Sequence, residues 1–503
     1  MEKDYEGVIL TTCCDSIRRL YDVLKEEFPD KFIYMLDTPR LLKEVGVGLY
    51  ESRIRAMIRA YEEFSGKCFD EKVFLDYIRD KEESQQAGMK DHTVNIGILG
   101  ARANDSICEI LEKRNANVAF DLTCTGLGRK LFYDEKEPLR EYARGLLGQF
   151  PCMRMEQAAG RDELIRRYAD SVDGVIYHTV QFCDNYAYEY AWLKSWLKRP
   201  MLLLETDYTK QSYGQILTRI EAFLESLGKD AIKPVKKMEG KNGMYVLGID
   251  SGSTSTNAVI MDQDRNITAF SVVRTGAKSG ESADKVLEEV LEKASLSRED
   301  ISWIVSTGYG RVSIPFADEN VTEISCHGKG AHYFNPKIRT ILDIGGQDSK
   351  AIRLSENGEV KDFVMNDKCA AGTGRFLEMI ARTLEISLDE MGALALTSTE
   401  NIEITSMCSV FAESEVISLI ANNKEKNDIA NGVCNAIANK AYGLLRRAGM
   451  EPDFMMTGGV AKNPGVVRAV ERKLGADLYI CQEPEIVGAT GAALYALEQM
   501  QGK

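Results

Sequence analysis

The stretch VLGIDSGSTSTNAVI, residues 246–260, decides the fold class of the C-terminal half. Its apolar residues predict a strand that ends at Asp250, then a tight turn and a second strand from Ala258. Small residues let backbone N–H groups approach a phosphate, and hydroxyls in the turn add donors. Because hard cations prefer oxygen ligands, Asp250 is expected to hold Mg²⁺ through water. The predicted phosphate-binding residues of this turn are Gly252, Ser253 and Thr254.

Two further glycine turns follow in the same half. TILDIGGQDSK at 340–350 again places an aspartate, Asp343, on an apolar strand before a glycine pair. MMTGGVAKNP at 455–464 is expected to pass close to a nucleoside, and GATGAAL at 488–494 predicts a tightly packed helix. A single glycine turn after a strand is more often structural than functional. The additional candidate nucleotide-binding residues are Gly345, Gly346, Gln347, Gly458 and Gly459.

Taken in order, these turns resemble the superfamily of actin, hexokinase and heat-shock chaperone ATPases. The resemblance spans residues 244–503, and Asp343 follows Asp250 by 93 residues. It implies an α/β fold of two ribonuclease-H-like subdomains that close on Mg-ATP, with both aspartates as catalytic carboxylates. A small-molecule kinase of the same superfamily fits the turns as well, and it would form a phosphorylated product and hold no iron.

Two cysteines lie at the starts of predicted amphipathic helices. Cys369 is in MNDKCAAGTGRF, and Cys408 is in ITSMCSVFAESEV. A helix N-terminus offers unpaired N–H groups and the positive end of the helix dipole, which favours a thiolate or an anionic cluster. The predicted buried stripes are Phe376, Leu377, Ile380 and Leu384 on the first helix and Phe411, Val416, Leu419 and Ile420 on the second.

With these cysteines, the C-terminal half closely resembles the activator of 2-hydroxyacyl-CoA dehydratases, the BadF/BadG/BcrA/BcrD ATPase family. The matching pieces are GIDSGST, STGYGR at 306–311, LDIGGQD, NDKCAAGTGRF and the Cys408 helix. The resemblance implies a homodimer in which Cys369 and Cys408 of both subunits share one [4Fe-4S] cluster. ATP hydrolysis would drive an electron from a ferredoxin or flavodoxin to a dehydratase or a double-cubane cluster protein.

One departure from that family is Asn257, where many members carry lysine. The phosphate contacts are expected to change there, or the cation's role to pass to Lys350. The remaining cysteines of this half are expected to be packing residues. They are Cys326, Cys434 and Cys481.

The N-terminal half is expected to be a second α/β region. KDAIKPVKKMEGK at 229–241 indicates a linker, so we predict a domain at 1–230, a linker at 231–243 and the ATPase at 244–503. KEESQQ at 81–86 predicts an internal seam near 81–91. Strands predicted at 94–100, 118–122, 174–178 and 201–205 alternate with helices, which favours a parallel sheet. GILGARAND at 97–105 lacks the G-x-G-x-x-G spacing, which argues against NAD.

Three cysteines of this half, Cys14, Cys124 and Cys183, lie just past predicted strands, where one parallel sheet would bring them together. Three thiolates fit a [4Fe-4S] cluster with one open iron, although packed cysteines fit the spacing equally. TCCDSIRR, DLTCTGLGR and FCDNY resemble the 2-hydroxyacyl-CoA dehydratase subunit family, which includes the double-cubane proteins. The resemblance implies that these three cysteines are ligands of a second cluster and that the domain is N-terminally incomplete. A docking module without a cluster is the alternative.

The amino-acid composition excludes several other classes of protein. The net charge of 63 − 77 = −14 argues against a general nucleic-acid or anionic-membrane surface. Twelve cysteines in 503 residues are too few for a disulfide scaffold. The sequence shows neither a signal-peptide pattern at MEKDYEGVIL nor an apolar run of about 18 residues. We therefore expect a cytoplasmic protein with free thiols and no nucleic-acid or membrane partner. The iron–sulfur clusters that the resemblance implies would make it oxygen-sensitive.

Overall fold

The computed structural model describes most of the chain and divides it into two units, Met1–Leu217 and Thr218–Lys503. The described residues are 5–84, 94–103, 105–123, 136–148, 152–156, 160–181, 183–207, 213–228, 244–276, 278–366, 370–405 and 408–501. Cys124, Cys369 and the linker expected at 231–243 lie outside them. The boundary between the units falls inside a helix, α8 (Tyr213–Ser226), and therefore earlier than the linker.

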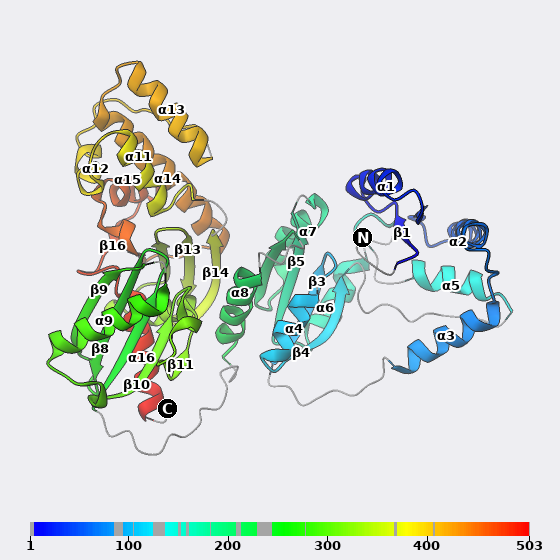
Figure 1. Cartoon of the computed structure of the whole chain (residues 1–503), viewed down its shortest axis with the longest axis horizontal. Helices are drawn as coiled ribbons and strands as arrows, with labels where there is room; N and C mark the ends of the chain where they lie inside the picture. The colour runs from blue at the N-terminus through cyan, green and yellow to red at the C-terminus, as the bar shows by residue number, and fades with distance from the viewer. Residues whose placement is uncertain are drawn as a thin grey trace. The chain divides into compact units, whose positions relative to one another are not determined.

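The first unit contains two small sheets (Figure 1). One pairs β1 (Gly7–Thr11) in parallel with β2 (Phe32–Leu36), and the other has the parallel order β4-β3-β5-β6. The strands of the second sheet are β3 (Val94–Gly100), β4 (Ala116–Thr123), β5 (Gly174–Val180) and β6 (Met201–Thr206). All four predicted strands of that sheet are confirmed, whereas β1 does not join it.

The helices of the first unit cover both sheets and link them. They are α1 (Asp15–Glu27), α2 (Glu44–Ser65), α3 (Glu71–Ser84), α4 (Asp105–Lys113), α5 (Pro138–Leu147), α6 (Arg161–Ala169) and α7 (Asp184–Trp196). α5 follows β4 in the chain but packs its Leu139 and Ala143 against Val47 and Ile54 of α2. α3 is helical as far as Ser84, so the start of the predicted seam is helix, and residues 85–93 are outside the described part.

The second unit contains two five-stranded sheets with the same topology. Their orders are β9-β8-β7-β10-β11 and β14-β13-β12-β15-β16, and in each the first three strands are antiparallel and the last two join in parallel. The strands are β7 (Tyr245–Ser251), β8 (Ser255–Asp262), β9 (Ile267–Arg274), β10 (Ile301–Thr307), β11 (Glu319–Asn320), β12 (Thr340–Ile344), β13 (Ser349–Leu354), β14 (Val360–Asn366), β15 (Phe454–Thr457) and β16 (Leu478–Tyr479). This repeat confirms the predicted pair of ribonuclease-H-like subdomains.

Helices cover both faces of the first of these sheets. Because side chains alternate along a strand, β7 sends Leu247 toward α9 (Ser279–Ala294) and Val246 toward α16 (Val487–Gln501). α10 (Glu323–Phe334) packs against α16. Gly248 permits the close approach of α16, since a Cβ there would lie 2.0 Å from the Ala489 carbonyl oxygen.

The remaining helices gather around the second sheet, at the far end of this unit from β8 and β10 (Figure 1). They are α11 (Gly374–Thr383), α12 (Leu388–Ala395), α13 (Ser409–Ala421), α14 (Lys426–Ala448) and α15 (Pro464–Leu474). They share one apolar core with β12 and β15. Within the described residues of the chain, no helix has the length and apolar character needed to span a membrane.

Candidate functional site

Asp250 is the penultimate residue of β7 in the first subdomain of the second unit, one residue before the end of the strand, and its side chain is almost fully buried. Two glycines make room for the carboxylate: a Cβ at Gly308 or at Gly488 would lie 2.4 or 2.3 Å from one of its oxygens. Burial raises the pKa of Asp250 to about 6, and nearby Glu323 adds to the rise, against the positive charge of His327. Asp250 is therefore ionised only above about pH 6.

Asp343 occupies the equivalent position on β12 of the second subdomain. Its neighbours in register are Thr457 on β15 and Lys350 on β13. The Thr457 hydroxyl donates to Asp343 Oδ1 over 3.0 Å, and Lys350 Nζ donates to Oδ2 over 3.2 Å. His327 Nε2 of α10 lies 3.3 Å from Oδ1. The sheet register and α10 thus hold both carboxylate oxygens.

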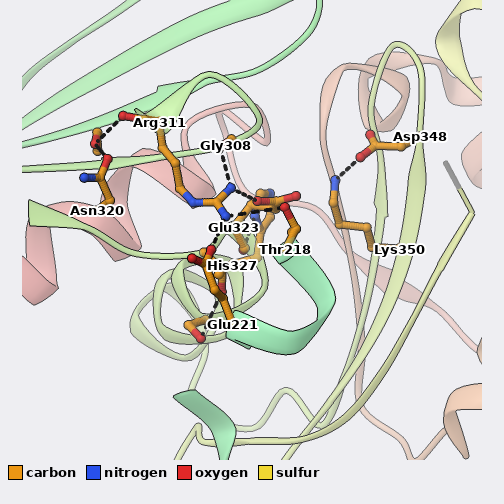
Figure 2. A network of polar contacts seen from close by, with 12 residues as sticks. Thr218, Glu221, Gly308, Arg311, Asn320, Glu323, His327, Asp348 and Lys350 are labelled. Atoms are coloured by element: carbon orange, nitrogen blue, oxygen red, sulfur yellow. Dashed lines mark hydrogen bonds and ion pairs between the residues drawn. The ribbon is translucent and has the colours of Figure 1, made fainter. Parts of the chain in front are cut away.

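The charges around Asp343 fix its protonation state. Burial alone would lower the pKa of His327, but the Asp343 and Asp250 carboxylates outweigh it and raise that pKa to about 9. Burial would likewise raise the pKa of Asp343, but the cations of His327 and Lys350 hold it well below its usual range. Lys350 also pairs with Asp348 over 2.7 Å (Figure 2). At neutral pH the site therefore contains an ionised Asp343 between two cations.

The predicted phosphate loops meet in the structure. A Cβ at Gly346 would lie 1.6 Å from Thr254 Oγ1, so only glycine allows the 345–347 loop to approach the 252–254 turn this closely. Gly458 has a positive φ of 82° and lies against Asp343, where a Cβ would be 2.8 Å from Oδ1. Two loops from different subdomains thus lie together, and the third predicted turn adjoins the second aspartate.

A shallow pocket of about 460 Å³ opens beside the 458–464 turn. Its lining residues are Leu396, Ala461, Lys462, Pro464, Val467, Arg468, Glu471 and Ile480. It offers apolar space next to the turn for which the sequence predicts a nucleoside.

Asn257 stands opposite Asp250 on β8 and is buried. Its Nδ2 donates to the Glu485 carbonyl oxygen over 3.0 Å, so this side chain ties β8 to the segment before α16. Lys350 contacts the other aspartate, Asp343.

Cys408 is the N-cap residue of α13 and is exposed, which agrees with its predicted place at a helix start. Cys369 lies outside the described residues, five positions before α11. An exposed thiol at a free helix N-terminus has the donor chemistry that an anionic iron–sulfur cluster needs. The buried stripe predicted for α13 is partly wrong: Val416 is buried, but Phe411 and Ile420 are exposed.

A chain of backbone and side-chain contacts joins the phosphate loop to these helices. The N–H groups of Gly374 and Arg375 at the start of α11 donate to the carbonyl oxygens of Gly345 and Gly346, each over 2.9 Å. Thr383 at the end of α11 donates to Glu413 of α13 over 3.2 Å. Both helices that follow the candidate cluster cysteines are thus connected to the second phosphate loop.

In the N-terminal half, Cys14 and Cys183 are the N-cap residues of α1 and α7. β1 and β5 belong to different sheets, so a single sheet does not bring them together, contrary to the prediction. They are nevertheless electrostatic neighbours: burial raises the pKa of Cys183, and Cys14 and Cys152 raise it further. Cys152, which the sequence analysis did not select, therefore joins this group.

The described residues contain no ready-made group of three metal ligands. The other cysteines behave as predicted in the C-terminal half, where Cys326, Cys434 and Cys481 are all buried. Sequence reasoning missed His327, although only four histidines occur in the chain and this one follows Glu323 by one helical turn.

Comparisons with known proteins identify the family of this half. The model of the BadF/BadG/BcrA/BcrD ATPase family matches residues 247–496. The activator of lactoyl-CoA dehydratase from Anaerotignum propionicum is 52% identical over 260 residues, which are 52% of this chain and 100% of that protein. The chain belongs to this ATPase family. The (R)-2-hydroxyglutaryl-CoA dehydratase activating ATPase of Acidaminococcus fermentans is 44% identical over 257 residues, 51% of this chain and 98% of its own.

Solved structures show the same fold in the second unit. The activator of the 2-hydroxyisocaproyl-CoA dehydratase from Clostridium difficile, with bound ADPNP, has a TM-score of 0.50 at 41% identity and covers 52% of this chain and 96% of its own. The N-terminal half matches a different family model, the D-component of 2-hydroxyglutaryl-CoA dehydratase, at residues 2–95 and 72–227. The protein is thus an ATPase of the dehydratase-activator family joined to a dehydratase-type half.

Proposed function

We propose that this protein couples ATP hydrolysis to low-potential, one-electron reduction of an iron–sulfur acceptor of the dehydratase or double-cubane type. The observation that carries the proposal is the link from the second phosphate loop, through the Gly374 and Arg375 N–H groups, to α11 and α13. A [4Fe-4S] cluster, when bound, supplies a one-electron carrier. Cys369 and Cys408 would hold it, because both stand just before these helices.

In hydrolysis, Asp250 and Asp343 would have different roles. Asp250, ionised above about pH 6, would hold Mg²⁺ through water, and Asp343, kept ionised by His327 and Lys350, would orient the attacking water. The N–H groups of the 253–254 and 346–347 segments would serve as fixed donors to the phosphates, whereas those of Gly252 and Gly345 donate to carbonyl oxygens within the turns and close them. Loss of phosphate contacts in the 346–347 segment would act directly on α11, whose first N–H groups are bonded to the Gly345 and Gly346 carbonyl oxygens.

The apolar face of α13 supports a homodimer. Val410, Phe411 and Ile417 are between 53% and 68% exposed beside Cys408. Two cysteines cannot complete a four-thiolate shell, but two copies related by a two-fold axis can. The same axis would cover the exposed α13 faces. We further propose a ferredoxin or flavodoxin as donor, and as acceptor either the N-terminal half or a separate dehydratase, since relatives are named activators of such enzymes.

The test is anaerobic iron analysis, an electron paramagnetic resonance spectrum of the reduced protein, and light scattering on the full chain. Cys408→Ala is expected to lose about two irons per chain, one shared four-iron cluster per dimer, and to weaken the dimer while ATP binding survives. Cys68→Ala, which removes another exposed thiol, is the matched control. A Cys408→Ala protein that keeps its full iron content as a dimer would show the proposal to be wrong.

A further inference from the structure

The second half of α8 is a structural part of the ATPase unit. α8 lies inside the residues that match the dehydratase D-component and ends before residue 247, where the ATPase family match begins. Yet from Thr218 onward it groups with the ATPase unit, and its Ile220, Phe223 and Leu224 are buried. α8 therefore belongs to the dehydratase D-component match by sequence, but its second half packs within the unit that contains the ATPase match.

The first contact of α8 is with Arg311, a buried side chain of the STGYGR motif. Arg311 Nη2 donates to Glu221 Oε2 over 2.5 Å and to Thr218 Oγ1 over 3.4 Å, both on α8 (Figure 2). Its other terminal nitrogen donates to the Gly308 carbonyl oxygen over 3.0 Å and faces Glu323 at 3.5 Å. Glu221 of α8 is thus closer to this guanidinium than Glu323 is.

The second contact is a helix cap. α10 begins at Glu323 after Thr322, and the Thr322 hydroxyl does not cap its own helix. Instead Glu225 of α8 accepts the Thr322 N–H over 3.2 Å and also accepts the hydroxyls of Thr322 and Ser325. A carboxylate at a helix N-terminus satisfies unpaired donors and complements the helix dipole. Glu225 therefore fixes the start of α10 from outside.

Each of these two contacts holds a segment that itself touches one of the two candidate catalytic carboxylates. Gly308, held by Arg311, packs so closely on Asp250 that a Cβ would lie 2.4 Å from its oxygen. α10, held by Glu225, carries His327, whose Nδ1 lies 2.9 Å from the Glu323 carbonyl oxygen and whose Nε2 contacts Asp343. α8 thus contacts the supports of both aspartates.

We propose that Glu221 and Glu225 of α8 are positioning residues for ATP hydrolysis, so that the catalytic geometry of this ATPase depends on the last helix of its dehydratase-type half. Glu221 holds the Gly308–Arg311 turn against Asp250, and Glu225 holds α10 with His327 against Asp343. The inference rests on the ATPase activity and is independent of the proposed electron transfer.

The experiment compares full-length variants by steady-state hydrolysis of Mg-ATP, with thermal unfolding measured in parallel. Glu225→Ala removes the carboxylate that accepts at the α10 cap and is expected to lower kcat by about tenfold or more with little change in KM, because displacements of about 1 Å cost up to about a hundredfold. Glu225→Gln keeps one acceptor oxygen and is expected to recover most of kcat. Glu221→Gln is expected to lower kcat in the same way through Arg311.

Ser226→Ala is the matched control on the same helix, because within the described part of the chain its hydroxyl donates only to the Phe223 carbonyl oxygen. If Glu225→Ala does not fold, Ser325→Ala tests the same cap from the other side and is expected to reduce kcat severalfold. Folded Glu221 and Glu225 variants with the kcat of Ser226→Ala would overturn the inference. Missing iron or missing electron transfer in an active wild-type preparation would instead count only against the proposed function.

Discussion

Replacing His327 by glutamine removes one of the cations that hold the Asp343 carboxylate. In the wild type, the Asp343 and Asp250 charges overcome burial and raise the pKa of His327 from 6.5 to about 9. That difference corresponds to about 3 kcal/mol of extra interaction with the protonated ring. Because the pKa is raised on folding, this stability is fully present below pH 6.5 and is lost as the pH rises through 9. His327→Gln is therefore expected to destabilise the protein at pH 6 but not at pH 10.

The assay is an NMR titration of the histidine rings in nucleotide-free protein without added divalent cation. The chain has only four histidines, so selectively labelled rings give few signals, and the signal lost in His327→Gln identifies the residue. It is expected to titrate near pH 9. His178 is an internal control, since burial lowers its pKa and it lies in the other unit.

Asp343→Asn is the matched variant, because it keeps the size of the side chain and removes the nearer charge. In that protein burial should dominate, and the His327 pKa should fall well below its wild-type value. The reasoning would be refuted if the His327 signal titrated at or below 6.5 in the wild type, or if Asp343→Asn left it unchanged.

The remaining predictions concern hydrolysis, the second cluster and pH-dependent stability. Asp343→Asn is expected to bind nucleotide but to lower kcat by at least about a hundredfold, a loss of several kcal/mol; undiminished turnover contradicts it. Serine at Cys14, Cys124 and Cys183 together is expected to lower the iron content below that of the wild type, whereas a triple variant with the wild-type iron content favours a docking role. Glu319→Gln is expected to stabilise the protein by about 2 kcal/mol at pH 8 but not at pH 5, since burial raises the Glu319 pKa to about 7 and favours its neutral form; urea unfolding at both pH values decides this.

The parts of the fold that sequence predicts here are those set by local pattern. Strand β7, its turn and Asp250 follow from one continuous stretch, and β12 with Asp343 follows from another. The equivalence of the two carboxylates is visible in the sequence because each lies near the end of an apolar strand, two residues before a glycine, and the sheet repeat then confirms it. Burial of Cys326 and Cys434 was predictable for the same reason, since apolar neighbours surround both in sequence.

The contacts that complete the site join residues far apart in the chain. Glu225 meets Ser325 across 100 positions, and Thr457 meets Asp343 across 114. The spacing of apolar residues shows which face of a helix is buried, but it does not show what that face packs against. This explains why the predicted domain boundary at residue 230 assigns all of α8 to the N-terminal domain, whereas the structure groups it with the ATPase unit from Thr218 onward. It also explains Phe411, whose apolar character fits a buried stripe and an exposed apolar face equally well.

The polar contacts of α8 also show what the ATPase unit would lack without this helix. A flexible linker alone would leave Arg311 with the Gly308 carbonyl oxygen and a 3.5 Å contact to Glu323, and the start of α10 without its Glu225 cap. Unpaired buried charges and donors are costly, at about 1–3 kcal/mol for a neutral group and more for a charged one. Glu221 of α8 pairs with the Arg311 guanidinium, and Glu225 accepts hydrogen bonds at the start of α10. The last helix of the dehydratase-type half therefore supplies two acceptor carboxylates to the polar network around Asp250 and Asp343 of the candidate site.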